Sequence, residues 1–159
     1  MVFCRIAGAL ILALSGVLGA RWMNQSMAEA LSQVEGWLAL LRYVRMQVDC
    51  FALPMPVILA RADPELLRRC GYREGSPPQS FGALLASCEI RDGTCAELVR
   101  GFSEEFGKSY REEQSRGCEY YEVLLDERRE ALLSQLPARK KVNATLWVSG
   151  ALAIVILLI

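Results

Sequence analysis

The chain has a predominantly apolar run at each end, and nearly all charged residues lie between the two runs. Residues 142–159 contain no charged side chain and finish in Ala-Ile-Val-Ile-Leu-Leu-Ile. A helix rises 1.5 Å per residue, so about 20 apolar residues cross a hydrocarbon core of about 30 Å. The pattern predicts a transmembrane helix over residues 142–159, with Trp147 near the interface.

The apolar run at the other end is shorter. Arg5 is the only charged residue before Arg21, and residues 6–20 would form about 22 Å of helix. Because both arginines can extend toward the headgroups, we expect a second transmembrane helix over residues 2–21. The alternative is a cleaved signal peptide with Leu-Gly-Ala at residues 18–20 as its cleavage site. Leucine is larger than such sites usually accept.

Residues 22–141 would then form one domain on one side of the membrane. Arg139, Lys140 and Lys141 lie directly before the second predicted span. Positive residues beside a span favour the cytoplasmic side, although Arg5 argues weakly for the opposite orientation. We therefore expect a protein of the cell membrane with residues 22–141 in the cytoplasm.

The middle of the chain has the periodicity of helices and lacks the alternating pattern of strands. An apolar face recurs every three or four residues, as in helices that pack against neighbours, and we expect it to belong to the core. It should continue the first span as one long helix, ended by Pro54 and Pro56. The residues of this face are Met27, Leu31, Val34, Leu38, Leu41, Val44 and Val48.

Capping and turn residues divide the remainder into shorter helices. We expect one helix over residues 57–61 and another begun by Asp63 and ended by Gly71. Residues 71–79, rich in Gly, Pro and Ser, form a loop. Ser80 should cap a further helix that ends near Asp92.

Two capping boxes follow, in which a hydroxyl residue precedes a glutamate by three positions. They lie at residues 94–97 and 109–112. The first should open a helix ended by Gly107, and the second a long helix ended or kinked by Pro137. The expected fold is an all-α helical bundle flanked by two transmembrane helices.

Composition argues against an enzyme. The chain has no histidine, so Ser-His and Cys-His nucleophiles and a zinc site are not expected. There is no phosphate-binding loop motif, and the net charge of zero does not favour nucleic acid. We expect no catalytic residue, cofactor, metal or small-molecule substrate. The six scattered cysteines fit free thiols in a reducing compartment, with three disulfides of an exported domain as the alternative.

Four acidic residues recur at helical spacing late in the chain and define an acidic stripe. A charge run of this kind is usually a solvated face. The alternative is a docking face for a basic partner, in which complementary charge orients the two proteins. The acidic stripe consists of Glu119, Glu122, Asp126 and Glu130.

Several local patterns resemble the stage III sporulation protein AB family of endospore-forming bacteria. Phe-Gly-Lys-Ser-Tyr at residues 106–110, with Gln114 downstream, is similar to the family's Leu-Gly-x-Ser-Asp and its glutamine, although Tyr110 replaces the aspartate. Glu-Arg-Arg-Glu-Ala at residues 127–131 and the terminal apolar run follow in the family's order. Residues 47–55 keep the family's proline but not its glutamate, tyrosine or threonine. The likeness covers nearly the whole chain, and Pro137 departs from it.

The resemblance implies a membrane component of the channel complex between mother cell and forespore, placed in the mother-cell membrane. The middle domain would be similar to the cytoplasmic domains of type II secretion platform proteins. Its partners would be a secretion-type ATPase and other subunits of the complex. The competing hypothesis is an exported helical binding module, anchored by its C-terminal helix after signal-peptide cleavage.

Overall fold

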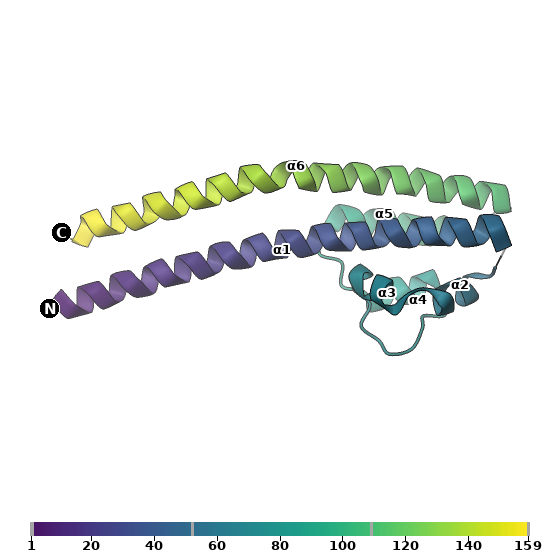
Figure 1. Cartoon of the computed structure of the whole chain (residues 1–159), viewed down its shortest axis with the longest axis horizontal. Coiled ribbons are helices and arrows are strands. Elements are labelled where there is room, and N and C mark those ends of the chain that lie inside the picture. Colours follow the sequence, from purple (N-terminus) through teal and green to yellow (C-terminus); the bar gives the residue numbers. More distant parts are fainter. Residues whose placement is uncertain (1, 52, 109, 159) are drawn as a thin grey trace. The chain divides into compact units, whose positions relative to one another are not determined.

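The described residues of the computed structural model form six helices, and no strand occurs among them (Figure 1). The prediction of an all-α fold is therefore confirmed. The backbone is described for residues 2–51, 53–108 and 110–158. Side chains are described for residues 19, 22, 25–51, 53–108, 110–137 and 150.

The chain begins with one long helix, α1, and ends with another, α6, and four shorter helices lie between them in the sequence. The helix α1 covers Val2–Phe51 and α6 covers Arg111–Leu158. The short helices are α2 (Met55–Arg61), α3 (Pro64–Cys70), α4 (Phe81–Ser87) and α5 (Gly93–Glu105).

The chain divides into two compact units. One consists of residues 29–131, and the other of residues 1–28 with residues 132–159. The first unit lies within the predicted middle domain, residues 22–141. The described residues include no helix stretch that is both long enough and apolar enough to cross a membrane. Apart from Gly19 and Gly150, the side chains of the predicted spans 2–21 and 142–159 lie outside the described residues, so both spans stay predictions.

The unit of residues 29–131 is built on an antiparallel pair, α1 and α6. Arg42 faces Glu122 and Arg45 faces Glu119, so residue numbers rise along one helix as they fall along the other. Figure 1 shows α2, α3 and α4 on the side of α1 away from α6. The predicted apolar face of α1 is confirmed where Val34, Leu38, Leu41, Val44 and Val48 are buried. Met27 and Leu31, at its start, are half-buried.

An aromatic chain joins four helices in the core. Trp37 of α1 lies 5.9 Å from Phe81 of α4, measured between ring centroids. Phe81 lies 4.9 Å from Phe102 of α5, edge to face, and Phe102 lies 5.6 Å from Tyr121 of α6. Edge-to-face pairs contribute about 0.5–1.5 kcal/mol beyond the area they bury. This cluster fixes α4, α5 and α6 around α1.

Most predicted helix boundaries agree with the structure. The helix α1 ends before Pro54, which is the N-cap of α2. Asp63 caps α3 by accepting a hydrogen bond from the Glu65 backbone N–H at 2.8 Å. Gly71 ends α3 with φ of 103°, a left-handed conformation that glycine adopts without strain. Ser80 caps α4 through the Ala83 N–H at 3.0 Å.

The predicted capping box at residues 94–97 is wrong. The N-cap of α5 is Asp92, whose Oδ1 accepts a hydrogen bond from the Cys95 N–H at 2.8 Å, and Thr94 lies inside the helix. Aspartate caps helices at least as well as threonine, and a cap at Asp92 makes the helix two residues longer than a cap at Thr94 would. The preceding helix α4 ends at Ser87, earlier than predicted. Ser109 of the second box lies outside the described residues.

Pro137 does not end α6, which continues to Leu158. A proline removes one intrahelical hydrogen bond, that to the carbonyl four residues earlier. Both Pro137 and Leu133 are exposed. The lost hydrogen bond therefore lies in an exposed part of the helix, where its loss costs least.

Candidate partner-binding site

Three members of the acidic stripe face arginines instead of standing free in solvent. The Glu122 side chain is only 14% exposed, and its Oε2 lies 3.7 Å from Arg42 Nε and 3.8 Å from Arg45 Nη1. Glu119 is 61% exposed and lies 3.5 Å from Arg45 Nη2. The interpretation of the stripe as a solvated face therefore does not hold for Glu122.

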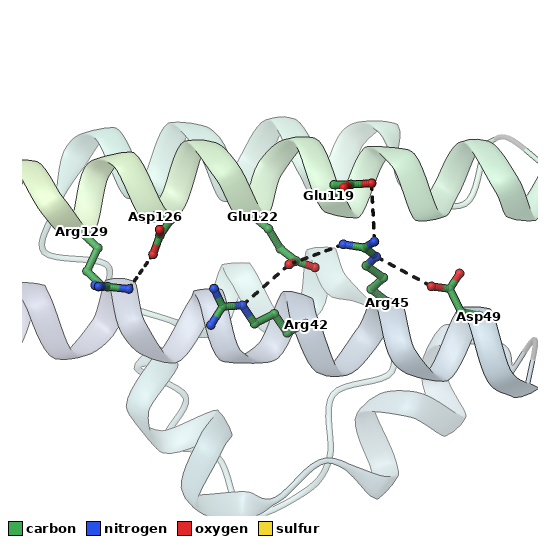
Figure 2. A network of polar contacts seen from close by, with 7 residues as sticks. All are labelled: Arg42, Arg45, Asp49, Glu119, Glu122, Asp126 and Arg129. Carbon is green, nitrogen blue, oxygen red and sulfur yellow. Dashed lines mark hydrogen bonds and ion pairs between the residues drawn. The ribbon is translucent and has the colours of Figure 1, made fainter.

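Two further ion pairs flank these contacts and complete a network of seven charged residues, and each of the two lies within a single helix. Asp126 accepts a hydrogen bond from Arg129, three residues later on α6. On α1, Asp49 lies 3.8 Å from Arg45, four residues earlier. Glu130, the last member of the stripe, is exposed. Figure 2 shows the α1 and α6 side chains directed toward one another across the gap between the two helices.

The arginines of this site were not singled out from the sequence. Arg42, Arg45 and Asp49 recur at spacings of three and four, which places them on one face of α1. That spacing matches Glu119, Glu122 and Asp126 with the charges largely inverted. Two helices that carry matching patterns of opposite charge are expected to pair, so this signal could have found the network.

Glu122 is poorly satisfied where it stands. Its Oε1 is buried and has no hydrogen-bond partner. Burial raises the pKa of its carboxyl, and Arg45 and Arg42 only partly offset that effect. A buried carboxylate oxygen without a donor costs free energy. The network therefore holds Glu122 electrostatically without giving it short hydrogen bonds.

A second charged pair in the same unit, Asp92 and Arg128, has shorter contacts than Glu122 has with its arginines. Asp92 is buried, and its two carboxylate oxygens accept hydrogen bonds from Arg128 Nε at 3.0 Å and Nη2 at 2.7 Å. These bonds hold the pKa of Asp92 below its usual range. The pair is bidentate, the strongest arrangement for arginine and carboxylate, and it joins the start of α5 to α6. The network between Arg42, Arg45 and Glu122 is longer and more open.

A groove of about 340 Å³ opens beside the network. Two of its side chains, Met46 and Cys50 on α1, are exposed. The groove therefore combines a thioether, a thiol, guanidinium groups and carboxylates in one accessible place. Its full lining is Arg42, Arg45, Met46, Asp49, Cys50 and Glu122.

Two other hollows lie elsewhere in the unit. One of about 430 Å³ lies between the end of α1 and the start of α6, with Val48, Phe81 and Arg111 in its wall. One of about 510 Å³ lies under the loop of residues 72–77. That loop is fixed by Tyr72, whose buried hydroxyl donates to the Ser76 carbonyl. Neither brings together groups that suit a particular reaction.

The buried cysteines are poor nucleophiles. Cys70, Cys95 and Cys118 are fully buried and carry free thiols. Burial raises the pKa of Cys95 and of Cys118 to about 12, and it raises that of Cys70 as well. Only the thiolate attacks, so these groups act as small apolar residues. Within the described part of the chain, no group of three or more ligating side chains could hold a metal ion.

Comparison of the chain with models of protein families, with curated proteins and with solved structures finds no match. The resemblance to the stage III sporulation protein AB family therefore stays a prediction.

Proposed function

We propose that this chain is a non-enzymatic, membrane-anchored scaffold of a secretion-like channel complex in sporulation, with its helical unit in the cytoplasm. The observation that carries the proposal is the charge distribution. Two apolar runs bracket a charged segment, and Arg139, Lys140 and Lys141 lie beside the second run. The local patterns that resemble the stage III sporulation protein AB family point to the same class.

The geometry of residues 29–131 supports a scaffold more than a catalyst. The cysteine thiols of the core are buried with raised pKa values, and Asp92 is engaged by Arg128. Charged groups on the outer sides of α1 and α6 are among those that remain accessible. Such charges suit orientation of a partner protein.

The proposed partners are a secretion-type ATPase and other subunits of the complex, and the proposed relatives of the fold are the cytoplasmic domains of type II secretion platform proteins. Of the predicted docking residues Glu119, Glu122, Asp126 and Glu130, two are exposed, Glu119 and Glu130. Glu130 is the one that an external basic partner can reach without breaking an ion pair between α1 and α6, because Glu119 pairs with Arg45.

The alternative function is an exported helical binding module that keeps only its C-terminal anchor. The residues that favour it are Leu-Gly-Ala at 18–20. It differs from the scaffold in one measurable respect, the mass of the mature chain.

Membrane fractionation and intact mass together test the proposal. The full chain should stay in the membrane after a carbonate wash and keep residues 1–20 by mass spectrometry. A mature chain that begins at Arg21 would establish the exported module. Release of the full chain by carbonate would refute the membrane anchor.

Co-purification with the candidate ATPase tests the partner. Glu130→Lys should lower capture, and raising salt should weaken capture of the wild type, because about 0.15 M salt screens exposed charges beyond about 8 Å. Glu97→Lys, an exposed reversal on α5, is the matched control. Equal capture by both variants and the wild type would remove Glu130 from the docking face.

A further inference from the structure

The outer side of the α1–α6 pair carries two rows of opposite charge, and we call it the α1–α6 face. It is open to solvent, since Arg42 is 58% exposed and two apolar residues, Met46 and Val123, are 47% and 53% exposed. Its charged residues are Arg42, Arg45 and Asp49 on α1 and Glu119, Glu122 and Asp126 on α6 (Figure 2). Met46 lines the same groove, and Val123 lies one helical turn after Glu119.

The two rows carry opposite charges at the two levels where ion pairs join the helices. The ion pairs place Arg42 level with Glu122 and Arg45 level with Glu119. Each level that these pairs define therefore presents a positive group on α1 and a negative group on α6.

We infer that the α1–α6 face binds a second copy of this chain. A twofold axis that runs parallel to the two helices places α1 of one copy over α6 of the other and keeps every level in register. Arg45 then meets the exposed Glu119 of the other copy. The rotation also places Met46 and Val123 in the interface, where their exposed apolar surface is removed from water.

The existing ion pairs leave room for these contacts. The pairs across the gap span 3.5–3.8 Å, whereas Asp92 and Arg128 in the same unit are hydrogen-bonded at 2.7 and 3.0 Å. A guanidinium carries five N–H donors. Arg45 can therefore donate a hydrogen bond to the Glu119 carboxylate of a second chain while it stays near Glu122.

A second copy fits this face better than an unrelated partner because the face is complementary to itself. A purely basic partner would meet Arg42 and Arg45, and a purely acidic one would meet Glu119 and Asp126. The direction of the axis rests on the proposed function. Residues 29 and 131 lie at the same end of the antiparallel pair, and this rotation keeps residues 29 and 131 of both copies on one side, as two copies anchored in one membrane require. The face itself does not depend on that function.

The test is the oligomeric state of the full chain, purified in detergent without any other protein. Light scattering coupled to size exclusion and sedimentation over a dilution series should give a dimer. Arg45→Glu and Glu119→Arg should each raise the dimer dissociation constant by at least about tenfold, because one substitution acts at two symmetric contacts. Combining the two restores opposite charges at this level and should recover the dimer. Arg100→Glu on the exposed side of α5 is the matched control.

Circular dichroism confirms that each variant is folded before its mass is measured, and the combined variant guards against a simple loss of fold. A monomeric wild type would overturn the inference, as would a dimer that both single reversals leave intact. Failure to form a dimer leaves carbonate extraction and ATPase capture unaffected, so it is distinct from failure of the proposed function.

Discussion

Asp92 both caps α5 and pairs with Arg128, so its removal should lower the free energy of unfolding more than any other single polar substitution in this unit. Its Oδ1 caps α5 through the Cys95 N–H, and both oxygens accept hydrogen bonds from Arg128. A lost N-cap costs about 1 kcal/mol, and a lost hydrogen bond to a charged group about 1.5–3 kcal/mol. Arg128 is 26% exposed and regains some hydration. Asp92→Ala should therefore destabilise the protein by about 2–4 kcal/mol.

Two further variants separate the contributions. Asp92→Asn keeps an acceptor for the cap but loses the charge, so it should cost about 1 kcal/mol less than Asp92→Ala. Thr94→Ala removes the residue that the capping-box pattern favoured, and it should change stability by within about 0.5 kcal/mol. Thermal unfolding of the full chain in detergent, followed by circular dichroism, measures all three. Equal losses for Thr94→Ala and Asp92→Ala would refute the assignment of the cap.

The pH dependence has a definite sign. Hydrogen bonds from Arg128 hold the pKa of Asp92 below its usual value, so the folded pKa lies below the unfolded one. The stabilisation is then fully present above the unfolded pKa, about 3.9, and is lost as pH falls through the folded pKa. The difference in melting temperature between wild type and Asp92→Asn should be largest near neutral pH and shrink below about pH 4. A difference that stays constant down to pH 2 would contradict the ionic role of Asp92.

Two other predictions concern packing. A Cβ on Gly36 would lie 2.9 Å from the backbone carbonyl carbon of Arg69, so Gly36→Ala should lower the melting temperature by forcing α1 and α3 apart. A Cβ on Gly117 of α6 meets no atom within 4 Å, so Gly117→Ala should stabilise the protein by about 0.5–1 kcal/mol. A loss of stability at Gly117 as large as that at Gly36 would contradict the close approach of α1 and α3. Phe102→Ala should lower the free energy of unfolding by about 3–5 kcal/mol, because Phe102 contacts three aromatic rings. Tyr120 is exposed, so Tyr120→Ala should lower it far less. Similar melting temperatures for the two variants would contradict the aromatic core.

Local signals in the sequence predicted the helices well. The structure confirms the signals that depend on neighbouring residues alone. These are the apolar period of α1, the caps Asp63 and Ser80, and the helix ends at Gly71 and Gly107. Contacts between distant residues decided the rest. Asp92 is favoured as a cap partly because Arg128, 36 positions later, engages it, and no local pattern contains that information.

The same reason explains what was missed at the candidate site. The acidic stripe was visible as a period on one helix, but its environment depends on α1, more than 70 positions earlier in the chain. Glu122 is covered because Arg42 and Arg45 lie opposite. A search for opposite charges at matching spacing on two helices would have related the two rows, whereas reading each helix alone could not.

Cys50 provides the most direct test of the proposal that the helical unit faces the cytoplasm. It is exposed, whereas Cys70, Cys95 and Cys118 are buried, so a maleimide that cannot cross membranes reports on Cys50 first. In intact cells that produce the full chain with Cys4→Ser, Cys50 should stay unlabelled, and it should react once the cells are opened. Peptide mass spectrometry assigns the modified residue. Labelling of Cys50 in intact cells would place the unit outside the cytoplasm and contradict the proposed scaffold.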